Sequence, residues 1–343
     1  MQGLTSRGSL KSSRPLSYLL EDLQDTPVVR AEVAHFLASS EGRPCPPELW
    51  LKRMQHWWTD NPAAPSHAAR GWALRSEGRL VGFMACIPSL MAWQGQPVPA
   101  GFPVSWRVAA EHRSGSLPML VKMRGLGRKM PLLDTTPNKQ VQEMLDKLGF
   151  RSVHQRHGHI FVLGPLLGKL LGRGRSFPRL ATGQRLITDP AQVTAIAKPY
   201  MSADRLESWT TPEFLRWRLA SPLIKLRFIG AVDADGVLSS YLILAEHVLK
   251  GQPAWLMVDW FTTGDSIEEV LALIGELSRQ PALFGHPTRR LLEAAIFPPE
   301  QESWSTAPSL MTLHRPASYY YLTPPSFEQC VKRCVVADGD YGM

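Results

Sequence analysis

The sequence predicts an α/β protein made of two similar units in tandem, each a mixed, mainly antiparallel sheet flanked by helices. Segments with helical periodicity alternate with segments of strand periodicity along the chain. Both halves follow one order, with helices first, then a hairpin, a strand, a helix and a further strand, which indicates a structural repeat. The length of 343 residues suits two domains, and 44% hydrophobic with 20% charged residues suits buried cores.

In the first half, helical spacing predicts two helices, and the second ends where Asp60-Asn61-Pro62 disfavours helix. Two strand-like runs then flank the turn at Glu77-Gly78. An amphipathic helix starts at Asn138, and Gly149 closes it as a C′ residue. The predicted helices are residues 27–40, 48–58, 117–123 and 138–148; the predicted strands are 71–76, 79–87, 91–93, 96–98, 104–110, 132–135, 150–153 and 159–163.

The second half repeats this order with different residues. A hairpin turn is expected at Asp235-Gly236, and Ser266 with Glu269 predicts a capping box at a helix start. The predicted helices are 189–198, 212–219 and 266–278, and the strands are 226–232, 237–247, 254–262, 290–296 and 318–322. We therefore expect a mobile tail at 1–17, a first domain at 18–163, a Gly-rich basic linker at 164–183 and a second domain at 184–343.

Composition narrows the classes of function. The net charge of +8 permits anionic partners, but the cations are scattered except at 169–179, and no nucleic-acid-binding motif stands out. No run approaches the roughly 20 apolar residues that cross a bilayer, and no secretory signal is visible, so we expect a cytoplasmic protein. The four cysteines suit neither a disulfide framework nor a zinc site, and we expect no metal.

One region carries a family resemblance. Its residues are Val81-Gly82, the run from Val108 to Leu117, Thr136-Pro137-Asn138, and Lys147-Leu148-Gly149-Phe150. Within the order of elements over residues 25–165, they resemble the GNAT superfamily of acyl-CoA-dependent N-acetyltransferases. In that family a central strand ends in a small-residue loop that opens a helix, and a later helix ends in Leu-Gly-Phe. The second half resembles the family in element order alone.

The resemblance implies a site for acetyl-CoA or another acyl-CoA. Backbone N–H groups at a helix N-terminus bind pyrophosphate, so the loop and helix start would hold the phosphates, with Arg107 or Lys122 near the adenosine phosphate. The strand before the loop would contact the pantetheine amides. The implied binding residues are Trp106, Arg107, Val108, Arg113, Ser114, Gly115, Ser116, Leu117 and Asn138.

The chain departs from the family pattern at two points. Ser116 or Pro118 stands where the last Gly or Ala of the loop belongs, and Pro118 removes an N–H donor. The tyrosine that many members carry on the helix after Asn138 is missing, and the first half holds only Tyr18, far upstream. These departures favour the fold over the cofactor site.

Three residues are candidates for acid–base or acceptor roles. Glu111 and His112 end the central strand, where a base could take a proton from an amine; the alternative is a solvated loop. Asp259 interrupts an apolar strand, so it is either functional or a structural partner for an arginine such as Arg218. The tryptophans 57, 58, 72, 93 and 106 could line a sugar groove, but we expect core positions.

The leading hypothesis is therefore an N-acyltransferase that moves an acyl group from acyl-CoA to a primary amine. By analogy, the acceptor would be an amino sugar of bacterial surface or exopolysaccharide synthesis. Two alternatives stay open. One is a non-catalytic binding module that keeps the fold, and the other is an aminoacyl-tRNA-dependent transferase with twin units of this kind.

Overall fold

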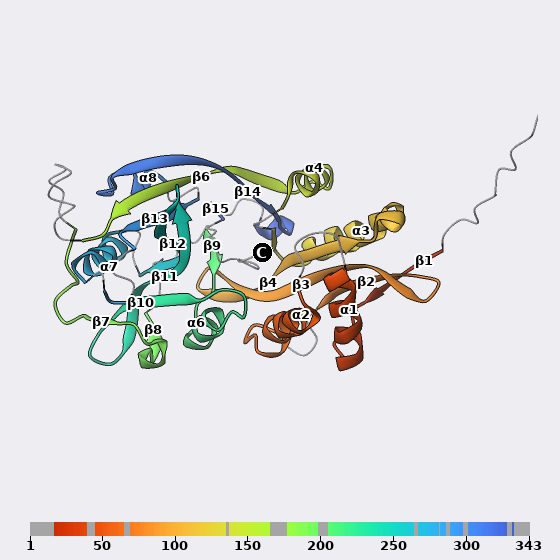
Figure 1. Ribbon diagram of the computed structural model, residues 1–343, viewed down its shortest axis with the longest axis horizontal. Coiled ribbons are helices and arrows are strands. Elements are labelled where there is room, and N and C mark those ends of the chain that lie inside the picture. The colour runs from red at the N-terminus through yellow and green to blue at the C-terminus, as the bar shows by residue number, and fades with distance from the viewer. Residues whose placement is uncertain are drawn as a thin grey trace, which may run out of the picture.

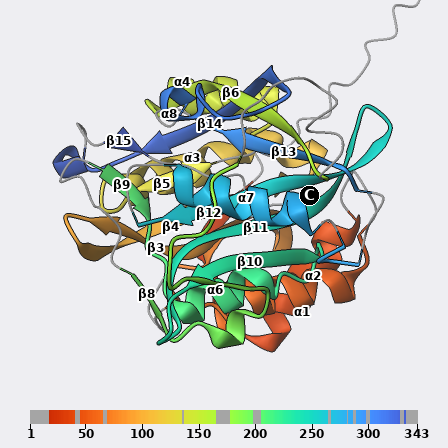
Figure 2. The same cartoon turned by 90° about the vertical axis from the view of Figure 1, so that its left-hand side faces the viewer.

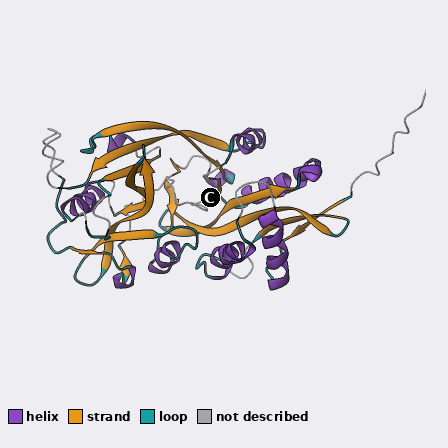
Figure 3. Ribbon diagram, viewed as in Figure 1, coloured by secondary structure: helices purple, strands orange, loops and turns teal. Residues whose placement is uncertain are grey.

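The structure is a computed structural model, and it describes residues 17–39, 45–64, 69–134, 137–164, 177–197, 205–263, 267–280, 282–285, 289–297, 301–327 and 331–332. Figure 1 shows an elongated molecule with the two halves side by side along its length, and Figure 3 shows helices on both sides of the strands. Residues 1–16 of the predicted tail and 165–176 of the predicted linker lie outside the described residues.

The first half is a sheet with helices on both faces. The helices α1 and α2 pack on one face through a core that includes Trp57 and Phe83, while α3 and α4 pack on the other around Met123 and Leu145. Its elements are β1 (Tyr18–Asp22), α1 (Pro27–Ser39), α2 (Pro47–Met54), the π-helix η1 (Gln55–Thr59), β2 (Gly71–Ser76), β3 (Arg79–Trp93), β4 (Gln96–Val108), the 3-10 helix η2 (Ala110–Ser116), α3 (Leu117–Gly127), β5 (Leu132–Asp134), α4 (Lys139–Lys147) and β6 (Arg151–Val162).

The second half is built in the same way, and it faces the viewer in Figure 2. The helix α7 packs on one face of its strands and α6 on the other. Its elements are β7 (Arg185–Ile187), η3 (Pro190–Gln192), β8 (Ala195–Ile196), β9 (Arg205–Ser208), α6 (Pro212–Leu219), β10 (Leu226–Val232), β11 (Val237–Leu249), β12 (Gln252–Thr262), α7 (Glu268–Arg279), β13 (Leu291–Ile296), α8 (Gln301–Trp304), β14 (Met311–Leu322), η4 (Pro325–Phe327) and β15 (Val331–Lys332).

The two halves exchange strands. The hydrogen-bonded order is β1-β2-β3-β4-β5-β14-β6-β13-β12-β11-β10-β7, so β14 from the end of the chain lies between β5 and β6. In return, β6 pairs with β13 of the second half. The long arches of β6 and β14 across the top of Figure 1 show this exchange. Because each half completes the sheet of the other, we expect the halves to unfold as one unit; the domain boundaries at 163 and 184 stay a prediction.

The structure confirms the α/β fold class and most predicted elements, and it corrects several of them. The helix predicted at 189–198 is wrong, because Asp189 caps a short 3-10 turn at Pro190 and the chain then extends into β8, which pairs with β11. Three pairs of strands that were predicted as separate each form one strand. The predicted strands 79–87 and 91–93 form β3, 96–98 and 104–110 form β4, which ends at Val108, and 150–153 and 159–163 form β6. The capping box falls partly on Ser266, which lies outside the described residues.

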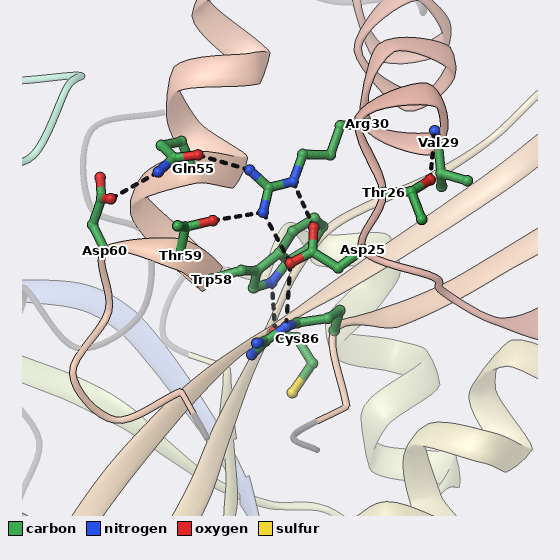
Figure 4. Close-up of polar contacts among 10 residues, drawn as sticks. Asp25, Thr26, Val29, Arg30, Gln55, Trp58, Thr59, Asp60 and Cys86 are labelled. Carbon is green, nitrogen blue, oxygen red and sulfur yellow. Dashed lines mark hydrogen bonds and ion pairs between the residues drawn. The ribbon is translucent and has the colours of Figure 1, made fainter. Parts of the chain in front are cut away.

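A polar network fixes α1 against α2 and the sheet (Figure 4). The Arg30 guanidinium of α1 donates to Asp25 at 2.5 and 2.9 Å, to Gln55 Oε1 at 2.8 Å and to Thr59 Oγ1 at 2.6 Å. It lies 5.9 Å from the ring of Trp58, whose indole N–H donates to the Cys86 carbonyl of β3 at 3.1 Å. This network holds the N-terminal end of α1 in place over the sheet.

The tryptophans of the first half serve mainly as core residues. Trp57, Trp58 and Trp72 are 2%, 1% and 3% exposed, so they cannot form a sugar groove on the surface. Trp93 and Trp106 are half-buried. The sequence expectation of core positions is confirmed for the first three.

Candidate functional site

The strands β4 and β5 diverge and leave a wedge between them. In the described part of the chain, their parallel pairing is limited to Gly101 with Leu132. The pairing of β4 with β3 shifts register between Phe83 and Ala85, and Ser105 opposite has a φ of 51°. A bulge of this kind bends a strand and redirects its side chains, which turns the end of β4 away from β5.

A cleft of about 740 Å³ opens at this wedge. Its walls come from the end of β4, from η2, from the N-terminal part of α4 and from the C-terminal end of α1. The lining residues are Phe36, Ser39, Trp106, Arg107, Val108, Ala109, Ala110, Glu111, Arg113, Ser116, Asn138, Gln140, Val141 and Met144. The cleft therefore contains six of the nine predicted binding residues: Trp106, Arg107, Val108, Arg113, Ser116 and Asn138.

The charges around the cleft favour an anion. Arg107 and Arg113 contribute two cations and Glu111 one carboxylate, so the walls carry a net positive charge. The N-terminus of α4 also faces the cleft, and the positive end of a helix dipole attracts negative groups. Asn138 caps that helix, since its Oδ1 accepts a hydrogen bond from Val141 N at 3.0 Å, and its side-chain NH₂ is a further donor.

The remaining three predicted binding residues are placed differently. The expected open loop is the 3-10 helix η2, which runs directly into α3. Gly115 is buried beneath Tyr18, and a Cβ on it would lie 2.8 Å from that ring. Position 115 therefore requires glycine because the Tyr18 ring packs on it, and not because a phosphate approaches the backbone. Ser114 Oγ lies 3.5 Å from the Tyr18 hydroxyl, and Leu117 is 62% exposed.

Glu111 and His112 lie at the edge of the cleft. Glu111 lines it with a side chain that is 73% exposed, and its Oε1 lies 3.9 Å from Nε2 of His112. His112 is buried behind Glu111, with its ring 5.9 Å from the ring of Tyr18 in an edge-on arrangement. Glu111 can reach a molecule in the cleft, whereas His112 can act on that molecule only through Glu111 or Tyr18.

Asp259 lies in the second half, away from this cleft. Its carboxylate accepts from the Arg218 guanidinium, from the Tyr241 hydroxyl at 3.3 Å and from Trp260 N at 2.7 Å. Burial raises the pKa of the Tyr241 phenol, which keeps it protonated as a donor. Arg218 is the arginine that the sequence suggested as a structural partner for Asp259. The two residues form a buried ion pair between α6 and β12.

In the second half, the equivalent gap between β12 and β13 is filled by side chains. The strand β12 pairs with β13 over Ala254 to Met257 and then shifts register against β11. Beyond that point Trp260 packs against Trp304, with ring centroids 5.5 Å apart, in the core beneath α7. Glu269 in the first turn of α7 accepts from Thr262 Oγ1 at 2.7 Å and Thr263 N at 3.2 Å. The protein's own carboxylate thus occupies this helix start.

Sequence reasoning missed part of the cleft wall. Phe36 and Ser39 come from α1, and Gln140, Val141 and Met144 from α4. Their positions at the ends of amphipathic helices were visible in the sequence, but no chemical signal marked them. Tyr18 is remote from the cleft in sequence, yet pairing of β1 with β2 brings it over Gly115.

Comparison with solved structures identifies the fold. A probable N-acyltransferase from Enterococcus faecalis superposes with a TM-score of 0.59 at 10% identity, over 91% of this chain and 74% of that one. A GCN5-related N-acetyltransferase from Anabaena variabilis gives 0.55 at 10% identity, over 89% and 72%. One from Kribbella flavida gives 0.54 at 14% identity, over 89% and 71%. The chain shares the fold of these three proteins.

Comparison at the level of sequence gives no assignment, since no protein-family model and no curated protein matches the chain. Among the residues that the structure describes, no helix is long and apolar enough to span a bilayer. The same residues hold no group of three or more His, Cys, Asp or Glu side chains that could bind a metal ion.

Proposed function

We propose that this protein is an N-acyltransferase that binds acyl-CoA in the cleft of its first half and transfers the acyl group to a primary amine. The observation that carries the proposal is the cleft itself. It opens where β4 and β5 diverge, and it is lined by six of the nine residues that the sequence pointed to as donor contacts. The shared fold with N-acetyltransferases supports the same assignment.

The cleft suits a long, phosphorylated thioester. Arg107 and Arg113 offer charge-assisted contacts to phosphates, and the N-terminus of α4 adds a helix dipole. The backbone of Trp106 to Val108 forms one wall and can exchange hydrogen bonds with an extended chain of amides. Because the wedge of the second half is filled by Trp260 and Trp304, we place the donor in the first half.

The chemistry requires direct attack of a neutral amine on the thioester carbonyl. A C–N bond forms, the C–S bond breaks, and the thiol leaves with one proton. Glu111 is our candidate base for the proton of the attacking amine, because its carboxylate lines the cleft and is accessible to water. We assign His112 to positioning of Glu111, and Asp259 to structural support of the second half.

Isothermal titration with acetyl-CoA and a long-chain acyl-CoA tests donor binding. Replacing both arginines, Arg107→Ala and Arg113→Ala, should weaken binding at least tenfold, since each hydrogen bond to a charged group contributes about 1.5–3 kcal/mol. The variant Gln140→Trp fills the cleft from the exposed face of α4 and should abolish binding without removing a charge. Arg79→Ala, an exposed arginine on β3, is the matched control.

Thiol release in the presence of amine acceptors then tests the transfer. The panel includes amino sugars, which stay a prediction for the acceptor, together with amino acids and polyamines. Glu111→Gln should lower kcat with little change in donor affinity. Failure of the wild-type protein to bind any acyl-CoA would remove the proposal.

A non-catalytic binding module is the second candidate. The observation that favours it is the 3-10 helix η2 with Tyr18 packed on Gly115, where the family has an open phosphate loop. Under this alternative, the well-folded protein binds neither acetyl-CoA nor a long-chain acyl-CoA, and no acceptor accelerates thiol release.

A further inference from the structure

The exposed face of α3 combines basic and apolar side chains. Leu117 and Val121 lie one turn apart and are 62% and 59% exposed. Arg124 is exposed on the same stripe, and Arg128 follows it directly beyond the helix end. The opposite face carries Met119, Leu120 and Met123 into the core, so the helix is fixed and the basic, apolar face points outward.

The charge of this face is uniform. No acidic residue occurs between Glu111 and Asp134, a stretch that holds the exposed cations Arg113, Lys122, Arg124, Arg128 and Lys129. Lys122 lies 3.3 Å from the carboxylate of Asp22, which is itself exposed. The sequence alone hides the pattern, because the cations alternate with apolar residues that turn out to be buried.

The exposed leucine and valine, together with the cations, are best complemented by the surface of an anionic lipid bilayer. An anionic lipid bilayer offers phosphate charge to the arginines and an acyl boundary to the apolar side chains. Nucleic acid would use the cations but would gain nothing from Leu117 and Val121. A single exposed apolar residue is ordinary on a protein surface, whereas two on one stripe within a basic face are not.

We propose that the exposed face of α3 docks the protein on anionic membranes. Figure 1 shows α3 in the first half, away from β10 to β13. Ser116, which lines the cleft, directly precedes Leu117, so the docking face lies next to the cleft. The inference stands on the α3 face alone and does not depend on acyl transfer.

Sedimentation with lipid vesicles tests this docking. The full-length protein should bind vesicles that contain phosphatidylglycerol and phosphatidylcholine, and it should stay in solution with phosphatidylcholine alone. The triple variant Val121→Ser, Arg124→Ser, Arg128→Ser should bind the anionic vesicles more than about 25-fold more weakly, because each of the two cations contributes about a fivefold factor and Val121 adds its own apolar contact. None of these three residues lines the cleft.

A matched triple variant controls for charge and fold. Val28→Ser, Arg79→Ser and Lys225→Ser remove one valine, which is 78% exposed, and two exposed cations from other surfaces. This control should keep the vesicle binding of the wild type. Equal weakening in both triples would reduce the effect to net charge and overturn the proposal. So would binding to RNA without binding to vesicles, or full vesicle binding by the single variant Val121→Ser.

Discussion

The ion pair between Arg218 and Asp259 tests whether Asp259 is a structural or an acceptor-binding residue. Both residues are almost completely buried, at 7% and 3% exposure. Removing one partner leaves the other charge buried, which typically costs about 3–5 kcal/mol of folding free energy. We therefore expect Arg218→Met and Asp259→Asn each to destabilise the protein by that amount.

The double variant makes the prediction sharper. Asn at position 259 keeps an oxygen that can accept from Trp260 N, and Met at position 218 keeps an apolar stem beside Phe214. The double variant should therefore lose about 2–3 kcal/mol less than the sum of the two single changes, since neither charge is left alone.

Urea denaturation followed by tryptophan fluorescence measures these differences. Because the halves exchange β6 and β14, we expect one cooperative transition for the whole chain. If Asp259→Asn unfolds at the wild-type urea concentration but fails to use an acceptor, the structural assignment is wrong and Asp259 belongs to an acceptor site. Additive losses in the double variant would also contradict the paired arrangement.

Two further predictions concern stability. Burial lowers the pKa of His159 and of His56 to about 4. Each histidine should therefore remove roughly 2 kcal/mol of folding free energy between pH 7.5 and pH 5, because it gains a proton below pH 6.5 in the unfolded state but not in the folded state. His159→Phe should reduce the total loss by about 2 kcal/mol in urea titrations at the two pH values, and the exposed His35→Gln should not reduce it. Gly71 has a φ of 132°, and a Cβ there would lie 2.1 Å from the Met84 carbonyl oxygen. Gly71→Ala should therefore lower the folding free energy by at least about 3 kcal/mol, whereas Gly78→Ala, where a Cβ meets open space, should lower it by about 1–2 kcal/mol. Equal thermal stability of the two variants would refute this account of Gly71.

Local patterns predicted much of the first half. Helical spacing and Pro27 indicated α1, and Gly149 with a φ of 82° closes α4 as expected. The turns at Glu77-Gly78 and Asp235-Gly236 join strands as their residue types predict. These features depend on residues close in sequence, which is why the sequence reveals them.

Long-range pairing could not be predicted in the same way. The sequence marks β14 as a strand through Tyr319 to Tyr321 but does not specify β5 and β6 as its partners. The helix predicted at 189–198 failed because pairing with β11 outweighs a weak local helical pattern. Each half therefore looks separable in sequence, although the sheet joins them.

The candidate site shows the same division. The end of β4 and Arg113 were recognisable because strand, loop and helix follow one another in the chain. Tyr18 was not, because only the pairing of β1 with β2 brings it to Gly115. The filled wedge of the second half was equally hidden, since Trp304 comes from α8 and is 44 residues away from Trp260 in sequence.

Hydrogen exchange in the presence and absence of saturating acyl-CoA locates the donor most directly. We predict slower amide exchange in peptides that cover Trp106 to Ser116 and Asn138 to Met144, and no change in peptides that cover Thr262 to Leu273. Protection confined to the second half, or no protection anywhere at saturating acyl-CoA, would contradict the central claim that the first-half cleft binds the donor.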